Sequence, residues 1–256
     1  MAAALKIVPA TNGLQWLRIG WLLFMRNPLM WILAFSAQWL IVAVLGQIPV
    51  IGLVLATLIM PAFSVGFMTM GAAAEGGRPL EPALLFAGFR STPGPLFALG
   101  GAYLIAGALT LLIANFTSDM TVSTTPEGQA VLTGIESMDL LIPGIFFALA
   151  HMAFFFAPAL TAWHRMTPPK AMFFSFFACL RNWRAFLLYG LALVLMICGG
   201  LLLFSLLMAL VLGGEAPGNA LQNFAFAFIL GLMPALLASV YAGYRDIFGG
   251  PAAPPG

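Results

Sequence analysis

The stretch AFLLYGLALVLMICGGLLLFSLLMALVL, from Ala185 to Leu212, contains no charged residue. A helix needs about 20 apolar residues to cross the hydrocarbon layer of a bilayer, and this stretch exceeds that length. A strand of a membrane β-barrel would instead alternate apolar and polar residues over about ten positions. Here every face of the segment is apolar, so the stretch predicts a membrane-spanning helix.

The whole chain shares this composition. Of its 256 residues, 62% are hydrophobic and 7% are charged, against roughly 25% charged residues in a soluble domain. With 8 acidic and 10 basic residues, the polar surface is too small to cover a globule of this length, so lipid must surround the apolar faces. The near-neutral charge balance gives no indication of nucleic acid. We therefore expect the lipid bilayer, and no nucleic acid, as the surroundings of this protein.

Five further stretches have the length and apolar character of membrane spans. Together with the first they are Pro28–Gly46, Val50–Ala74, Pro95–Asn115, Leu140–Trp163, Ala185–Leu212 and Gln222–Tyr244. The sequence therefore predicts an all-α fold, a polytopic transmembrane helix bundle of six spans, which forms a single integral membrane domain over residues 1–256.

The charged residues between these spans sort by sign onto two sides. One side carries all ten basic residues: Lys6, Arg18, Arg26, Arg78, Arg90, Arg165, Lys170, Arg181, Arg184 and Arg245. The other side has no Lys or Arg, and its acidic residues are Asp119, Glu127, Glu136, Asp139 and Glu215. Because loops rich in Lys and Arg stay in the cytoplasm, we expect both termini of this membrane protein to be cytoplasmic.

Two short phrases recur three times along the chain. The first contains Arg26, Arg90 or Arg181 just before a span, and the second is Pro-Ala-Phe or Pro-Ala-Leu at residues 61–63, 158–160 and 234–236. The pattern predicts three parallel helical-hairpin repeats, at about residues 12–78, 79–166 and 168–248. A chance match in so apolar a composition is the alternative. The three arginines are also expected to touch anionic lipid headgroups.

A segment able to lie in the membrane interface precedes the first span of each repeat. These segments are Thr11–Asn27, Pro82–Arg90 and Pro168–Arg181. In the first, Trp16 and Leu23 share one helical face while Gln15 and Arg18 share the opposite face, as expected of an interfacial helix. The alternative interpretation is that all three segments are loops.

Residues 116–139 form a polar insert that is predicted to be extracytoplasmic. Thr125, Pro126 and Glu127 resemble a helix N-terminus, and we expect a short amphipathic helix to follow them. Val131 and Leu132, with Ile135 and Met138, would form its apolar face. The tail at residues 249–256 is rich in Pro and Gly and is expected to be disordered.

Two polar residues near the middle of the predicted spans are the candidate intramembrane site. They are His151 in the fourth span and Gln38 in the first. One interpretation is a neutral imidazole that bonds to a backbone carbonyl or to Gln38 and serves helix packing. The other is a proton or substrate site, because an imidazole titrates near neutral pH. A buried carboxylate partner for His151 is missing from the spans, which counts against the second interpretation.

Three prolines are predicted to kink their spans. Pro61, Pro158 and Pro234 each free a backbone carbonyl one turn earlier, at Thr57, Phe154 and Leu230. A freed carbonyl can bind a cation. The alternative is that water, Ser or Thr satisfies each carbonyl and that the kink serves packing.

The sequence contains no motif for a phosphate loop, a catalytic nucleophile or a metal site. We therefore expect a protein that is not an enzyme and that holds no cofactor and no metal. A lipid-headgroup enzyme is the alternative, in which the basic residues Arg90, His164, Arg165 and Arg181 would bind a phosphate.

The phrases Arg26-Asn27-Pro28 and Arg181-Asn182-Trp183, together with the three Pro-Ala phrases, resemble an uncharacterised family of proteobacterial six-helix inner-membrane proteins. This resemblance covers nearly the whole chain. It implies localisation in the inner membrane and supplies no catalytic residues. The chain is also similar to membrane domains found beside some glycerophosphodiester phosphodiesterases, which implies a helper role without the catalytic part.

Two functional hypotheses follow. The first is a non-catalytic module that packs with a partner membrane protein, with a second copy of itself or with lipids. It rests on small-residue helix faces, Phe-rich interfacial segments and the scarcity of charge inside the spans. The second is a small-solute transporter or channel that uses a mid-membrane site at His151 and Gln38. The two hypotheses differ in whether His151 faces a polar path through the membrane.

Overall fold

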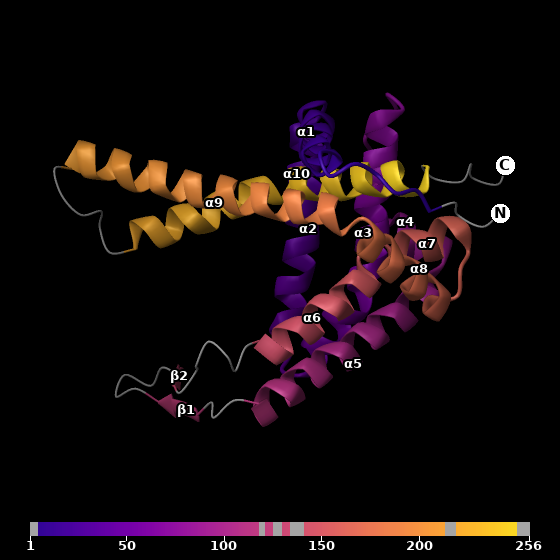
Figure 1. Cartoon of the computed structure of the whole chain (residues 1–256), viewed down its shortest axis with the longest axis horizontal. Helices are drawn as coiled ribbons and strands as arrows, with labels where there is room; N and C mark the ends of the chain where they lie inside the picture. Colours follow the sequence, from indigo (N-terminus) through magenta and orange to yellow (C-terminus); the bar gives the residue numbers. More distant parts are fainter. Residues whose placement is uncertain (1–4, 118–120, 125–129, 134–140, 213–218, 250–256) are drawn as a thin grey trace.

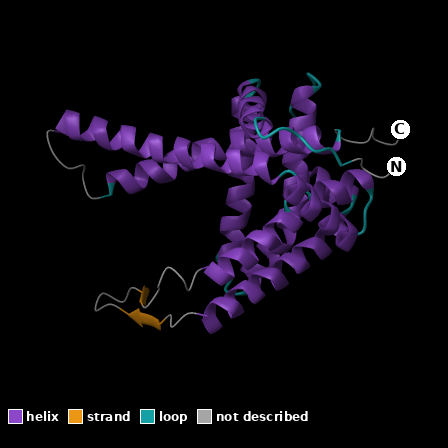
Figure 2. Ribbon diagram, in the orientation of Figure 1, coloured by secondary structure: helices purple, strands orange, loops and turns teal. Residues whose placement is uncertain are grey.

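A computed structural model describes residues 5–117, 121–124, 130–133, 141–212 and 219–249 (Figure 1). Most of these residues are helical (Figure 2). In chain order the elements are α1 (Asn12–Met25), α2 (Pro28–Gly46), α3 (Ile51–Glu75), the 3₁₀ helix η1 (Pro82–Phe86), α4 (Ala87–Ser91), α5 (Pro93–Thr117), β1 (Thr121–Thr124), β2 (Ala130–Thr133), α6 (Leu141–Phe154), α7 (Ala157–His164), α8 (Pro168–Arg181), α9 (Trp183–Leu212) and α10 (Ala220–Phe248).

Six helical segments in the described part of the chain are long and apolar enough to cross a membrane. They are α2, α3, α5, α6 with α7, α9 and α10, and they match the six predicted spans. The all-α, six-span fold class is therefore confirmed. The fourth span is interrupted at Phe155 and Phe156, because Pro158 in the first turn of α7 cannot continue the hydrogen bonding of α6.

The phrase Arg26-Asn27-Pro28 and the two prolines after Thr167 mark the starts of α2 and α8 by local chemistry. The Asn27 side chain accepts a hydrogen bond from the Met30 amide at 3.3 Å, and Pro28 occupies the first turn of α2. The extended residue Thr167 precedes two prolines at the start of α8. These caps separate each short helix from the long helix that follows or precedes it.

The three segments predicted to lie in the interface are helical, as α1, as η1 with α4, and as α8. Each packs on a hairpin from an earlier or later part of the chain: α1 on α10 and α9, η1 and α4 on α3, and α8 on α6 and α7. In α1, Trp16 and Leu23 are buried while Gln15 and Arg18 are exposed, as predicted. The alternative that these segments are loops is therefore wrong. The threefold repeat itself stays a prediction.

The molecule has two parts that differ in packing. We call residues 5–34, 61–100, 154–189 and 234–249 the hub. The three arms are residues 35–60, residues 101–117 with 141–153, and residues 190–212 with 219–233. Figure 1 shows the second arm (α5 and α6) and the third arm (α9 and α10) diverging from the hub, where both termini lie.

Nearly all buried side chains belong to the hub. Among the described residues, the arms bury only Gln38, Gly52, Ala56 and Pro143, and the third arm buries none. The hub instead contains one continuous apolar cluster that includes Trp16, Trp31 and Phe63. Stability is therefore concentrated at one end of the spans.

Glycines allow the helices of the hub to approach closely. A Cβ atom at Gly66 of α3 would collide with the backbone carbonyl of Leu85 in η1. A Cβ atom at Gly20 of α1 would lie 2.5 Å from the Ser239 Cβ of α10. Gly231, in the third arm, has nothing within 4 Å of the corresponding position. Close backbone contact between helices is thus frequent in the hub, and in the first arm it occurs at Gly52, where a Cβ atom would collide with the Leu45 carbonyl.

The structure corrects the prediction for the polar insert. Residues Ala130–Thr133 form strand β2, which pairs antiparallel with β1 so that Thr121 faces Thr133. The amphipathic helix predicted to contain Val131 and Leu132 is therefore wrong, because an antiparallel ladder satisfies their backbone groups instead. Phe116 and Thr117 belong to α5, so the insert begins later than predicted. Thr125–Glu127, Ile135, Met138 and tail residues 250–256 lie outside the described residues.

Candidate functional site

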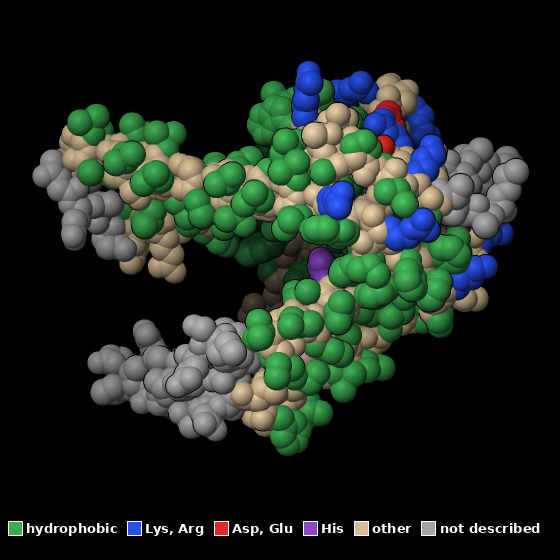
Figure 3. Space-filling model, in the orientation of Figure 1, with side chains coloured by type: hydrophobic (Ala, Val, Ile, Leu, Met, Phe, Trp, Pro, Cys, Tyr) green, Lys and Arg blue, Asp and Glu red, His purple; other side chains and the backbone are tan. Residues whose placement is uncertain are grey.

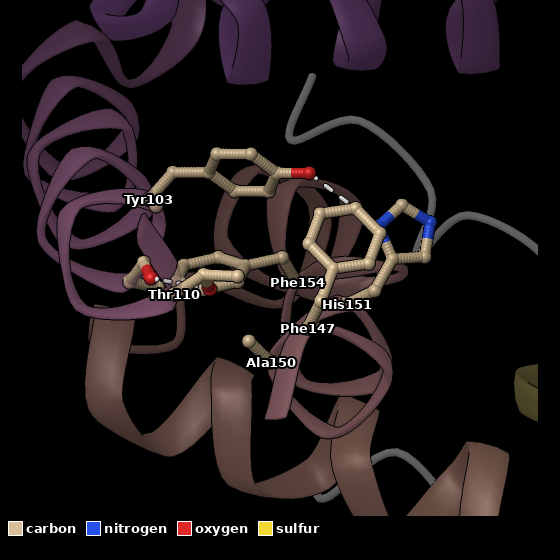
Figure 4. Close-up of a pocket in the computed structure, with 8 residues that line it drawn as sticks. Tyr103, Thr110, Phe147, Ala150, His151 and Phe154 are labelled. Atoms are coloured by element: carbon tan, nitrogen blue, oxygen red, sulfur yellow. Dashed lines mark hydrogen bonds between the residues drawn. The ribbon is translucent and has the colours of Figure 1, made fainter. Parts of the chain in front are cut away.

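His151 lies on α6, in the second arm, beside Tyr103 of α5. The Tyr103 hydroxyl and His151 Nδ1 are 3.4 Å apart, and the rings of Phe147 and Phe155 flank the imidazole at 5.8 and 5.9 Å. Figure 4 shows the close-up of the groove between the two helices, with the Tyr103 hydroxyl directed at the imidazole. The other residues that line this groove are Ala106, Gly107, Thr110, Ala150 and Phe154.

The groove combines apolar walls with two hydrogen-bonding groups at mid-span. His151 is exposed on the arm, where an ionisable side chain is costly unless water or a polar partner meets it. A neutral imidazole beside a phenol can donate one hydrogen bond and accept another. The groove can therefore bind a polar group presented within the membrane.

Gln38 does not share this groove. It is buried on α2, in the first arm, and its amide donates to Met60 Sδ of α3 at 3.2 Å. Within the described part of the chain, no hydrogen bond joins Gln38 to His151. The structure thus gives the two candidate residues separate partners in separate arms.

The interruption before Pro158 is bridged by a serine from another helix. The Ser175 hydroxyl of α8 accepts a hydrogen bond from the Phe156 amide at 2.9 Å and donates to the Met152 carbonyl at 2.8 Å. Cys179, one turn later on α8, contacts the same carbonyl through its sulfur at 3.6 Å. The serine thus bonds to the Met152 carbonyl and the Phe156 amide, and not to the Phe154 carbonyl that the sequence predicted to be freed. Pro61 and Pro234 are buried inside the continuous helices α3 and α10.

Cys179 is almost completely buried in the hub. Burial disfavours the thiolate and raises the pKa of the Cys179 thiol to about 12. The side chain thus acts as a small packing residue at ordinary pH. Cys198, in the third arm, is exposed, and both cysteines are free.

Two polar residues that sequence reasoning missed join distant parts of the hub. Asp246 of α10 accepts hydrogen bonds from Trp16 Nε1 and Asn12 Nδ2 of α1, both at 2.8 Å. Asn182, which follows α8, accepts from the Val8 amide at 2.8 Å and donates to the Lys6 carbonyl at 3.1 Å. These bonds attach the N-terminal segment and α1 to the last hairpin. Two features of the sequence could have indicated these residues. Asn182 belongs to a recurring phrase, and Asp246 is the one acidic residue after the last predicted span.

The three candidate arginines have different surroundings. Arg26, between α1 and α2, donates through Nη1 to the carbonyls of Ala74 and Glu75 and so caps the C-terminus of α3. Arg90 and Arg181 are exposed at the ends of α4 and α8. All ten Lys and Arg residues belong to the hub, and Figure 3 shows basic side chains on the hub rather than on the visible parts of the arms.

Glu75, the last residue of α3, is the centre of a charged cluster. Its carboxylate forms an ion pair with Arg245 of α10 and accepts a hydrogen bond from the Tyr241 hydroxyl at 2.7 Å. The side chains of Arg245 and Glu75 are 34% and 32% exposed. The cluster therefore stands at the surface of the hub, where it contacts solvent or headgroups.

The residues considered for a lipid-headgroup enzyme are not joined in one site. His164 Nε2 lies 2.7 Å from the Tyr244 hydroxyl of α10, inside the hub. Among the residues that the structure describes, Arg90, Arg165 and Arg181 make no hydrogen bond or ion pair with His164. Across the same residues, no three His, Cys, Asp or Glu side chains lie together as metal ligands.

Comparison with known proteins agrees with the membrane fold. A probable inner membrane protein of Burkholderia thailandensis is 35% identical over 262 residues, which cover 94% of this chain and 93% of that protein. No protein-family model matches the chain, and no solved structure matches it. The predicted resemblance to inner-membrane proteins of unknown function is thus confirmed, and the chain belongs to the family of this probable inner membrane protein.

Proposed function

We propose that this inner-membrane protein is a non-catalytic module that packs against another membrane protein through its arms. The observation that carries the proposal is the state of α9: no residue from 186 to 211 is buried. A helix of a self-contained bundle buries one face against its neighbours. The third arm leaves α9 available to a partner along most of its length.

Small residues on the arms support a protein partner rather than lipid alone. Ala227 and Gly231 lie four positions apart on α10, and Gly144 and Ala148 lie four positions apart on α6. All four are exposed, and nothing lies within 4 Å of a Cβ atom built on either glycine. Such pairs let a second helix approach closely within a membrane, where packing and not hydrophobic transfer drives association.

The polar side chains of the hub also favour a structural role. Asp246, Asn182 and Glu75 have their oxygen atoms engaged by other parts of the hub. His164 is paired with Tyr244. These contacts hold the short helices to the long ones, and a rigid hub presents the arms to a partner.

The proposal is tested by extracting the full chain from native membranes in polymer nanodiscs and measuring the proteins that co-purify. Gly231→Leu fills the small-residue face of α10 and is expected to reduce a stoichiometric partner by about tenfold, since a bulky residue prevents close helix contact. Leu180→Phe is the control, because Leu180 is exposed on α8 of the hub, outside the arms, and is already large. Recovery of wild-type chain with lipid alone, or equal partner recovery with Gly231→Leu, would contradict the proposal.

Transport is the second candidate, and the exposed His151 at mid-span is the observation that favours it. A solute pathway would need the second arm to close against another arm around the Tyr103–His151 groove. His151→Ala in proteoliposomes tests this function by solute or proton flux. Flux that depends on His151 would support transport, whereas equal flux in both proteins would remove it.

A further inference from the structure

Three arginines surround the single carboxylate of Glu75. Arg26 caps the backbone end of α3, Arg245 is paired with the Glu75 side chain, and Arg78 follows α3 after two glycines. A Cβ atom built on Gly76, the residue after Glu75, would lie 3.8 Å from Arg78 Nε, so the Arg78 side chain stays near the end of α3. Asp246, beside Arg245 in the sequence, is bonded instead to Asn12 and Trp16 of α1. Three guanidinium groups therefore outnumber the Glu75 carboxylate at this point on the hub.

Contacts within the hub fix the positions of two of these arginine side chains before any ligand binds. Glu75 fixes Arg245, and the two carbonyls at the end of α3 fix Arg26. A guanidinium has five N–H donors, so among the described residues most donors of Arg26 and Arg245 have no protein acceptor. Arg78 is exposed, and its guanidinium makes no hydrogen bond or ion pair within the described part of the chain. The cluster therefore presents forked donors outward.

The cluster stands at the end of three membrane spans. Glu75 ends α3, Arg26 precedes Pro28 at the start of α2, and Arg245 lies in the last turn of α10. This is the depth at which lipid phosphates lie. Apolar side chains adjoin it, since Leu22, Met25 and Leu29, close to Arg26 in sequence, are all more than half exposed.

We propose that Arg26, Arg78 and Arg245, gathered around Glu75, bind the phosphate of one anionic phospholipid headgroup. Charge complementarity selects an anionic headgroup over a zwitterionic one, and forked guanidinium donors match phosphate oxygens in geometry. The acyl chains then lie against the exposed apolar residues beside Arg26. Glu75 and Tyr241 act as positioning residues that hold Arg245. This site belongs to the hub and does not depend on a partner for the arms.

The test uses the purified full chain in a non-ionic detergent. Phosphatidylglycerol and phosphatidylcholine with identical acyl chains are titrated, and bound lipid is counted by native mass spectrometry. We expect one saturable phosphatidylglycerol per chain and weaker, unsaturated binding of phosphatidylcholine. Arg78→Gln should raise the dissociation constant for phosphatidylglycerol about fivefold, the effect of removing one cation near an anionic headgroup.

Arg78 is the preferred variant because its side chain supports no other part of the fold, whereas Arg26 also caps α3. Arg18→Gln removes the same charge from an exposed position on α1 and is the matched control, which should leave the dissociation constant unchanged. Equal binding of the two lipids would overturn the proposal, as would an equal loss in Arg78→Gln and Arg18→Gln. Glycerol phosphate is the soluble probe; if it binds as tightly as the lipid, the assignment to a membrane ligand is wrong.

Discussion

The hub and the third arm show two ways in which an apolar chain can use its helices. In the hub, Trp31, Phe156 and Tyr244 are completely buried, and polar groups such as Asp246 join helices that are distant in sequence. In the third arm, the α9 residues from 186 to 211 are all partly or fully exposed. Lipid is as apolar as Leu, so exposure of this arm costs little. The difference teaches that the hub determines stability, while the arms are free to determine association.

The polar chemistry divides in the same way. Many hub polar groups are engaged with other parts of the hub, as in the bridge that Ser175 makes across the interruption before Pro158. The polar pair of the second arm, Tyr103 and His151, lines a groove on the arm, where His151 is exposed and Tyr103 is half-buried. A partner or solute within the membrane would therefore meet the arms first, and lipid headgroups would meet the charged hub.

The largest expected difference is in membrane sidedness: the hub and the tips of the arms should face opposite sides of the membrane. In a chain whose Cys179 and Cys198 are replaced by Ala, Arg181→Cys marks the hub and Gln47→Cys marks the tip of the first arm. An impermeant thiol reagent added to intact cells should label only Gln47→Cys, because the basic hub is expected to be cytoplasmic. Labelling of both variants in intact cells would contradict the predicted orientation.

Close backbone packing gives the next largest difference. Gly66→Ala places a Cβ atom against the Leu85 carbonyl and should lower the free energy of unfolding by about 3 kcal/mol, the upper range for overpacking. Gly231→Ala meets open space and should be neutral or stabilising by up to about 1 kcal/mol, because Ala favours a helix. Thermal unfolding of both variants in the same detergent measures this. Equal destabilisation would mean that the arm packs as tightly as the hub.

A serine in the hub and a serine in the third arm should differ in how much their hydroxyl groups contribute to stability. Ser175→Ala leaves the Phe156 amide without its partner and leaves the Met152 carbonyl with only the weak contact from the Cys179 sulfur, at a cost of about 2 kcal/mol for buried backbone groups. Ser205, in the third arm, only bonds back to the Leu201 carbonyl at 2.9 Å, so Ser205→Ala should change the unfolding free energy by less than about 0.5 kcal/mol. A Ser175→Ala protein as stable as wild type would show that α8 does not bridge the interruption.

The smallest effect is a dependence of stability on alkaline pH. The thiol of Cys179 has a pKa of about 12 in the folded hub against 9.0 for an ordinary cysteine, so the unfolded chain loses its proton first as the pH rises. The unfolding free energy should therefore fall by about 1 kcal/mol between pH 9 and pH 10 on account of this group. Cys179→Ala should abolish that share of the slope, whereas Cys198→Ala should keep it. Identical slopes in all three proteins would contradict the burial of Cys179.

The sequence predicted the spans and the short helices well because each depends on local pattern. Uninterrupted apolar stretches such as Ala185–Leu212 require a membrane helix whatever their neighbours are. Asn27 with Pro28, and the prolines before α8, carry their own capping information. The two-stranded pairing of Thr121–Thr124 with Ala130–Thr133 was missed because pairing between strands depends on a second segment and not on helical spacing alone.

The candidate site was less predictable. Sequence position placed His151 and Gln38 at similar depth, but depth does not fix direction around a helix. His151 pairs with Tyr103, and Gln38 pairs with Met60. The cluster around Glu75 brings α3 and α10 together across 170 residues of sequence, and only tertiary packing could reveal it.

The distinction between hub and arms is tested most directly by photo-crosslinking in native membranes. Phe226 on the third arm and Phe173 on α8 of the hub are 58% and 59% exposed, so a benzophenone analogue of phenylalanine can replace either one at matched exposure. We predict that the analogue at Phe226 gives a discrete adduct with another membrane protein, while the analogue at Phe173 gives lipid adducts. Protein adducts from Phe173 alone, or lipid adducts alone from both positions, would contradict a docking role for the arms.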